Sequence, residues 1–137
     1  MARKKKQVIN TKAKKKRAVA RAAIHYPGSG TLRINGYTLD AYTQNKYIRM
    51  IIEEPLVLAG DLAGKVDIYV NVEGGGFMGQ AVAIRGAIAK GLAQINEDLR
   101  DVYMQYDRTL LVDDVRRVEP KKPLGRKARA KKQTSYR

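Results

Sequence analysis

Residues 66–95, VDIYVNVEGGGFMGQAVAIRGAIAKGLAQI, contain two different hydrophobic periods within one short stretch. From Val66 to Glu73, apolar and polar residues alternate with period two, which predicts a half-buried β-strand. From Phe77 to Ile95, apolar residues recur at helical spacing, which predicts an amphipathic α-helix. Glycines 74–76 separate the two. The stretch therefore predicts a fold that contains both sheet and helix.

The glycine run between strand and helix resembles two nucleotide-binding patterns, and it fits neither of them fully. Gly74-Gly75-Gly76-Phe77-Met78-Gly79 satisfies the G-x-G-x-x-G pattern of dinucleotide-binding loops. That fold needs another parallel strand after the helix, whereas residues 96–105 predict more helix. The phosphate-loop pattern also fails, because Gln80-Ala81 stands where Lys-Ser or Lys-Thr is required. The run therefore either turns the chain or lets an RNA phosphate approach a helix N-terminus, and the residues favour neither.

The segments before this stretch predict strands and a helix. Alternating residues over 17–26 and 31–34, joined by the turn-forming residues 27–30, predict a β-hairpin. Apolar residues over 41–58 fit a helix, and Pro55 is expected to kink or end it. The N-terminal half of the chain therefore adds a second strand pair and a helix.

The segments after the stretch predict a second helix and then a tail. Asn96, followed by two acidic residues, is typical of a helix N-cap, and this helix is expected to run to about Gln105. Residues 110–112 are expected to form a short extended anchor. From Val115 onward, prolines and a glycine lie among cations, which predicts a basic tail.

The main helix carries a second face, made of small residues, beside its apolar arc. Gly79, Ala83, Gly86, Lys90 and Ala93 share this face, which is suited to packing against another helix or lying on a sugar–phosphate backbone. Arg85 falls inside the apolar arc, where its side chain either extends to solvent or meets an anion, and the first is the simpler interpretation. Among the aromatic residues, Tyr37 and Tyr69 are expected to cover the sheet rather than to stack on bases.

Charge is distributed very unevenly along the 137 residues, whose net charge is +15. Residues 1–21 hold 10 basic residues and no acid, and residues 115–137 hold 10 basic residues and one acid. The middle, residues 22–114, holds 8 basic and 12 acidic residues, a net charge of −4. We therefore expect a globular core over 17–114 with basic arms at 1–16 and 115–137. Such arms repel themselves and are expected to order only on a polyanion, nucleic acid first.

Composition argues against several classes of protein. The chain has no cysteine and one histidine, His25, so disulfides, thiolate metal sites and histidine-based catalysis are not expected. It has no apolar run of membrane-spanning length, and residues 1–6 do not resemble a secretory signal. Asp113 and Asp114 are adjacent on an extended segment and would point to opposite faces, which makes a metal site there weak. We expect no enzyme activity and no cofactor.

The helix and its glycines resemble a known family. The spacing Gly74-Gly75-Gly76-x-x-Gly79-Gln80-x-x-Ala83-x-x-x-Ala87-x-Ala89-Lys90-Gly91-Leu92 resembles the signature of the S-nine family of small-ribosomal-subunit proteins. The resemblance extends from about residue 7 to the end of the chain. The ending Ser135-Tyr136-Arg137 is similar to the archaeal or eukaryotic branch, because the bacterial pattern closes with Ser-Lys-Arg.

This resemblance implies a fold and a function. The fold is a two-layer sandwich of the α+β or α/β class: a small mixed sheet with helices on one face, a left-handed β-α-β crossover, and long basic extensions at both termini. The function is that of a structural constituent of the small ribosomal subunit, cytoplasmic and ribosome-bound. The partners are rRNA of the head (3′ major domain), peptidyl-site tRNA at its anticodon stem-loop, and neighbouring head proteins. No membrane and no small-molecule substrate is expected.

The resemblance and the charge pattern together predict the contact residues. Those expected to bind rRNA are Lys4, Lys5, Lys6, Lys12, Lys14, Lys15, Lys16, Arg17, Gly74, Gly75, Gly76, Gly79, Gln80, Arg85, Lys90, Arg116, Arg117, Lys121, Lys122, Arg126, Lys127, Arg129, Lys131 and Lys132. Those expected near tRNA are Ser135, Tyr136 and Arg137. The alternative is a non-ribosomal protein that binds nucleic acid or compacts DNA, since basic arms around a small core suit that role equally well.

Overall fold

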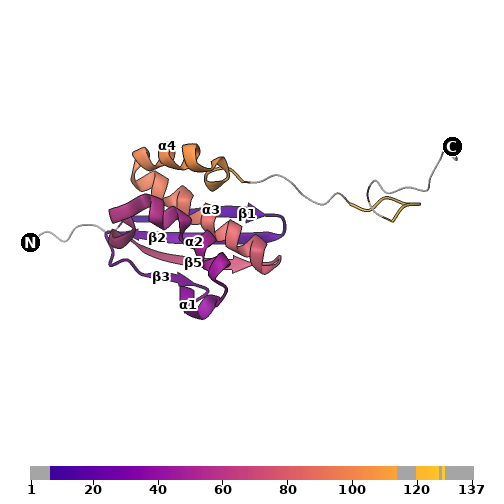
Figure 1. Cartoon of the computed structure of the whole chain (residues 1–137), viewed down its shortest axis with the longest axis horizontal. Helices are drawn as coiled ribbons and strands as arrows, with labels where there is room; N and C mark the ends of the chain where they lie inside the picture. Colours follow the sequence, from indigo (N-terminus) through magenta and orange to yellow (C-terminus); the bar gives the residue numbers. More distant parts are fainter. Residues whose placement is uncertain (1–6, 114–119, 127, 129–137) are drawn as a thin grey trace, which may run out of the picture.

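A five-stranded mixed sheet forms one layer of the molecule (Figure 1). The computed structural model describes residues 7–113, 120–126 and 128. Its strands follow the spatial order β1-β2-β5-β3-β4, and only the β3–β5 pair is parallel. The strand bounds are β1 Gln7–Lys15, β2 Ala18–Tyr26, β3 Leu32–Ile34, β4 Tyr37–Thr38 and β5 Asp67–Glu73.

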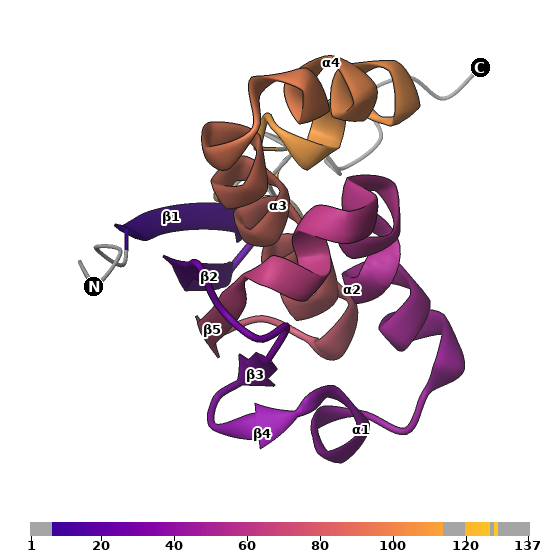
Figure 2. The ribbon, with the colours of Figure 1, turned by 90° about the vertical axis from the view of Figure 1, so that its left-hand side faces the viewer.

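Helices form the second layer. Figure 2 shows α2 and α3 on one side of the sheet, with α4 packed against both of them. The predicted two-layer α+β fold is therefore confirmed, and no helix in the described part of the chain is long and apolar enough to span a membrane. The helix bounds are α1 Leu39–Tyr42, α2 Lys46–Ala59, α3 Phe77–Ile95 and α4 Glu97–Tyr106, with 3-10 turns η1 Gly60–Lys65 and η2 Arg108–Leu110.

The stretch that combines strand and helix folds as its periods predict. In β5, Ile68 and Val70 are buried under the helices, whereas Tyr69 and Asn71 are exposed on the other side. The helix α3 has the predicted bounds, and ten of its residues are buried. The N-cap of α4 is also confirmed, because the Asn96 side chain accepts a hydrogen bond from the Asp98 backbone N–H at 3.1 Å.

The small residues of α3 pack on the sheet. The sequence predicts that this face contacts another helix or a sugar–phosphate backbone instead. A Cβ placed on Gly86 would lie 3.2 Å from the Ala13 Cβ of β1, and one placed on Gly79 would lie 3.6 Å from the Ala18 Cβ of β2. The close approach of α3 to β1 therefore depends on a small residue at Gly86, whereas Gly79 lies at ordinary contact distance from β2. The partner of this face is a pair of strands, not another helix or a nucleic-acid backbone.

The largest departure from the sequence prediction is β1. Residues 1–16 were expected to form an arm that orders only on a polyanion, yet residues 7–15 pair antiparallel with β2. Ile9 and Ala13 are buried beneath α3, and the Thr11 hydroxyl donates to the Ala87 carbonyl at 2.7 Å. The expectation is wrong for 7–15 because these alternating residues dock on α3 while the lysines between them point away.

The predicted hairpin between residues 17–26 and 31–34 is also wrong. Both segments are strands, but β5 lies between β2 and β3 and pairs with each of them. The Asp67 carboxylate at the start of β5 accepts hydrogen bonds from the backbone N–H groups of Ser29 and Thr31, at 2.9 and 3.2 Å. These bonds lower the pKa of Asp67 and fix the connecting loop against β5 rather than in a tight turn.

Two helical predictions need correction. The helix expected over 41–58 is divided into α1 and α2, and the Asn45 side chain caps α2 by accepting from the Tyr47 N–H at 2.9 Å. Pro55 does not end α2, which continues to Ala59. It is buried, and its carbonyl accepts the Tyr103 hydroxyl at 2.7 Å. Residues 110–112 are not an extended anchor. Leu110 closes η2, where it is buried.

The parallel strands β3 and β5 are connected through α2. This β3-α2-β5 unit is the one for which the family resemblance implies a left-handed crossover. Its left-handedness stays a prediction, as does the division of the chain at residues 114 and 115.

Candidate nucleic-acid interface

The glycine run at the start of α3 is first of all a turn. Gly74 and Gly75 have φ values of 76° and 66°, which L side chains rarely adopt. A Cβ on Gly74 would lie 2.6 Å from the Arg17 carbonyl oxygen, so only glycine fits against the β1–β2 hairpin. Gly76 differs, because its φ is −93° and nothing lies within 4 Å of its Cβ position. Geometry explains Gly74 and Gly75, and it leaves Gly76 unexplained.

Gln80 fixes this turn onto the helix. Its side-chain N–H donates to the Gly74 carbonyl at 3.1 Å, and its side-chain oxygen accepts the Tyr42 hydroxyl at 2.9 Å. Burial raises the pKa of Tyr42, so this hydroxyl keeps its proton and remains a donor. Gln80 therefore connects α1, the glycine turn and α3. Both polar ends of its side chain are used within the protein.

The N-terminus of α3 itself is open. Gly76 occupies the N-cap position, and no side chain accepts a hydrogen bond from the first turn. Phe77 beside it is 66% exposed. The free N–H groups and the positive end of the helix dipole favour an anion at such a place. The phosphate interpretation is therefore compatible with Gly76 and the first turn, whereas Gly74 and Gly75 serve the fold.

Arg85 is an internal ion-pair residue. Its side chain is 10% exposed, its Nε lies 2.7 Å from Glu54 Oε2, and its Nη2 lies 2.9 Å from Asp107 Oδ2. Burial raises the pKa of Asp107, but the Thr109 backbone N–H and the Arg85 guanidinium outweigh it and lower the pKa overall. Arg85 neither extends to solvent nor faces a surface where RNA could reach it. Its anions belong to α2 and to the N-cap of η2.

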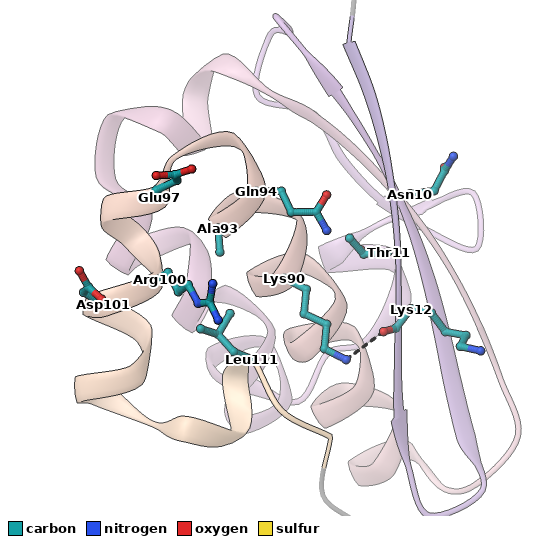
Figure 3. A pocket seen from close by; sticks show the side chains of 10 residues that line it. All are labelled: Asn10, Thr11, Lys12, Lys90, Ala93, Gln94, Glu97, Arg100, Asp101 and Leu111. Atoms are coloured by element: carbon teal, nitrogen blue, oxygen red, sulfur yellow. Dashed lines mark hydrogen bonds between the residues drawn. The ribbon is translucent and has the colours of Figure 1, made fainter.

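Lys90 also has partners within the protein. Its ammonium donates to Asp113 Oδ1 at 2.6 Å and to the Lys12 carbonyl at 3.0 Å, which links α3 to the outer edge of β1 (Figure 3). The groove around it mixes both signs of charge, because Glu97 and Asp101 of α4 also line it. A polyanion would meet carboxylates here, so this groove is a weaker candidate than the other basic surfaces.

Within the predicted set, the exposed cations of the described chain lie on β1, on the turn after it and on the segment after residue 120. Lys15 is half-buried between them. The exposed members of the predicted set in the described part of the chain are Lys12, Lys14, Lys16, Arg17, Lys121, Lys122 and Arg126. The members that lie outside the described residues are Lys4, Lys5, Lys6, Arg116, Arg117, Lys127, Arg129, Lys131, Lys132, Ser135, Tyr136 and Arg137.

A further surface was not in the predicted set. The side of the sheet opposite α2 and α3 carries the outward residues of β1, β2, β3 and β5, and we call it the open face (Figure 2). Arg21 and Tyr69 are exposed there, and both fall on the polar side of strands that the alternation predicts correctly. The signal for their orientation was present in the sequence. Their neighbours across the strands depend on strand order and could not be read from it.

Comparison with known proteins identifies the family. A family model described as ribosomal protein S9/S16 matches residues 13–137. The chain is 50% identical over 133 residues to the small ribosomal subunit protein uS9 of Pyrobaculum aerophilum, covering 96% of this chain and 92% of that protein. The protein of the same name from Thermoplasma volcanium is 50% identical over 131 residues, 94% of this chain and 98% of its own length.

A third relative, the small ribosomal subunit protein uS9 of Methanococcus vannielii, is 42% identical over 135 residues, which cover 96% of this chain and 99% of that protein. These archaeal relatives agree with the branch that the ending of the chain predicts. The match includes the glycine turn, α3 and the basic C-terminal segment. The chain therefore belongs to the ribosomal protein S9/S16 family, whose members are structural proteins and not enzymes.

Proposed function

We propose that this chain is a structural constituent of the small ribosomal subunit that binds the rRNA of the head. The observation that carries the proposal is the family match over residues 13–137, together with relatives that are named small ribosomal subunit proteins. The distribution of charge supports it, because 20 of the 28 basic residues belong to the first 21 and the last 23 positions. The protein then acts in the ribosome, beside other proteins of the head.

The structure refines the set of residues proposed to contact rRNA. Phosphate contacts supply most of the affinity of such proteins, so exposed cations without carboxylate partners are the best candidates. We retain Lys12 and Lys14 of β1, the Lys16-Arg17 turn and the cations of the segment from Lys121 onward, with Gly76 at the start of α3. Arg85, Lys90, Gln80, Gly74, Gly75 and Gly79 have structural roles in the fold and are left out of the set.

The C-terminal residues are proposed to serve a second RNA. The resemblance to the family implies that Ser135, Tyr136 and Arg137 lie near the anticodon stem-loop of the peptidyl-site tRNA, where Arg137 would meet a backbone phosphate. The buried residues of the described chain all lie between positions 9 and 110, which supports this division of roles.

Sedimentation tests the ribosomal assignment. The tagged full-length chain is expressed in a host whose own ribosomes contain a protein of the same family. The cells are lysed without nuclease, and the lysate is separated on a density gradient. We expect the chain in the fractions that contain small subunits and in those of whole ribosomes. A chain found with bulk DNA, or only at the top of the gradient, would contradict the proposal. The first of these results would favour the DNA-compacting alternative.

Truncation tests the role of the tail. A chain without residues 134–137 is expected to fold and to enter small subunits as the full chain does, while those subunits bind tRNA at the peptidyl site more weakly. Binding is measured by filter retention of labelled tRNA on reconstituted subunits. If the truncated chain no longer enters subunits, the proposed division between a binding core and a tRNA-facing tail is wrong.

A further inference from the structure

The open face brings two cations directly opposite each other. Lys12 of β1 pairs in register with Arg21 of β2, and both side chains are exposed on the side away from α3. Figure 3 shows the Lys12 side chain directed away from the helices. Because the neighbouring Lys14 N–H bonds outward to Asp113 rather than to β2, positions 12 and 21 form a non-hydrogen-bonded pair, in which side chains approach most closely.

This pair lacks a counter-ion in the described part of the chain. No described carboxylate lies within ion-pair distance of Lys12 or Arg21. Of the two carboxylates on the open face, Asp67 is held by Ser29 and Thr31, and Glu73 pairs in register with Val19. Like charges directly opposite each other on a sheet destabilise it. Because the fold holds Lys12 and Arg21 opposite each other with no neighbouring carboxylate, this position is suited to an external anion that contacts both cations.

An exposed aromatic ring stands beside the cations. Tyr69 of β5 is 43% exposed, and it lies two residues from Asn71, which pairs with Arg21. Its neighbours across the strands are Ala23 on one side and Arg33 on the other. The small Ala23 side chain covers little of the ring, and His25 contacts it edge-on, with ring centroids 5.4 Å apart and planes at 88°. Two residues along β5 span about 7 Å, so ring and cations are within reach of one ligand.

We propose that the open face of the sheet binds one strand of rRNA, with Lys12 and Arg21 on its phosphates and Tyr69 stacked on a base. This inference rests on the proposed function and extends it, because it adds a sheet surface to the basic segments. Single-stranded nucleic acid is bound by this combination of cations that follow the backbone and aromatic rings that accept bases. Arg33 extends the cationic row on the far side of Tyr69.

The composition of the open face favours RNA over a protein partner. The centres of protein interfaces are depleted in charged residues and enriched in large apolar ones. Here the central positions are Arg21, Asn71 and Ala23, with Tyr69 as the large ring among them. A polyanion complements this surface, whereas an apolar protein surface would have to bury two unpaired cations.

The charge test compares two double variants of the full chain. Lys12→Gln with Arg21→Gln removes the pair, and Lys46→Gln with Lys65→Gln removes the same charge from two exposed positions off the sheet. The probe is a transcribed head fragment of small-subunit rRNA, and affinity is measured from about 50 to 200 mM salt. We expect the first variant to lower the slope of log K against log salt by roughly 1.4–1.8, because each lost phosphate contact contributes about 0.7–0.9. The control should bind like the wild type.

The stacking test uses Tyr69 alone. Tyr69→Phe keeps the ring and is expected to bind the fragment like the wild type, whereas Tyr69→Leu is expected to bind at least about fivefold more weakly. Thermal unfolding of each variant shows whether the sheet is intact. Removing the like-charged pair should not lower the unfolding midpoint, which separates a binding defect from a folding defect.

The outcomes distinguish this inference from the proposed function. If the wild type does not bind the rRNA fragment and does not sediment with small subunits, the proposed function fails. If the wild type binds and the Lys12/Arg21 variant equals the Lys46/Lys65 control, the inference about the open face is wrong while the function stands. Unchanged binding to the fragment with reduced entry into subunits would also overturn it, in favour of a protein partner on this face.

Discussion

The two faces of the sheet are built from the same strands but have opposite chemistry. On the covered face, Ala18, Ala20, Ala22 and Ile24 of β2 are at most 3% exposed and lie under α3. On the open face, the residues between them include Arg21, which pairs across the strands with Lys12 and Asn71, and His25, which pairs with Asp67 of β5. A shift of one residue in register would exchange the two sets. The period of the strand therefore separates the residues that stabilise the fold from those free to bind a partner.

The largest difference between the faces is expected in stability. Ile68→Ala leaves a cavity beneath α3 and should lower the free energy of unfolding by about 2–5 kcal/mol. Asn71→Ala, on the same strand and the open face, should change it by less than about 0.5 kcal/mol. Urea unfolding followed by circular dichroism measures both. Equal effects of the two substitutions would show that the open face also carries the stability of the sheet.

Substitutions in the glycine turn test the connection between β5 of the sheet and α3 of the helix layer. Gly74→Ala forces a side chain into left-handed backbone against the Arg17 carbonyl and should cost about 2–3 kcal/mol of stability. Gly76→Ala, with open space around it, is the matched control and should cost little. The same two proteins are tested for rRNA binding. A stable Gly76→Ala variant with weakened binding would place a phosphate at the start of α3, and unchanged binding would remove Gly76 from the contact set.

Arg85 is the buried charged residue of the covered side among the described residues. Arg85→Gln leaves Glu54 and Asp107 without their cation, and because both carboxylates are partly exposed we expect a loss of about 2 kcal/mol. Arg108→Gln removes an exposed cation from the same region and should change stability by less than about 0.5 kcal/mol. If Arg85→Gln instead spares stability and weakens rRNA binding, the role assigned to Arg85 is wrong.

The smallest effect concerns pH. The pKa of Asp107 is lower in the folded protein than its usual 3.8, so its ionised form stabilises the fold above about pH 4, and this contribution is lost as the pH falls through the lowered pKa. Asp107→Asn should therefore lose stability less steeply than the wild type between about pH 4 and pH 2. Urea midpoints across that range measure it. Asp101→Asn, an equal change of charge on an exposed part of α4, is the matched control variant.

The sequence predicts local structure well where one period dominates. α3 and β5 combine a long periodic pattern with glycines between them, and the structure has both within a residue of the predicted bounds. The strand β1 was missed because its lysines suggested an arm, while its burial depends on Ile9 and Ala13 meeting a distant helix. The order of β2, β5 and β3 could not be predicted either, because alternation states which side of a strand is buried and not which strand lies next to it.

The candidate site shows the same division. The sequence assigned the lysines of residues 1–16 to a basic arm that contacts RNA, and Lys12 and Lys14 are exposed although residues 7–15 form a strand, because net charge is a local property. It misplaced Arg85, because its partners Glu54 and Asp107 are 31 and 22 positions away along the chain. It also gave no sign that Lys12 and Arg21 would be cross-strand neighbours, which required the β1–β2 hairpin that charge alone argued against.

The contact between Lys90 and Asp113 has a consequence for the protein before it meets any RNA. β1 is an edge strand, and an unpaired edge can recruit the same strand from another copy and begin aggregation. The Lys90 ammonium occupies the Lys12 carbonyl, and the Asp113 carboxylate occupies the Lys14 N–H, so two of the outward backbone groups already have partners. Side chains from α3 and from the segment after η2 thus leave fewer backbone groups of β1 open to pairing with a second copy of the chain.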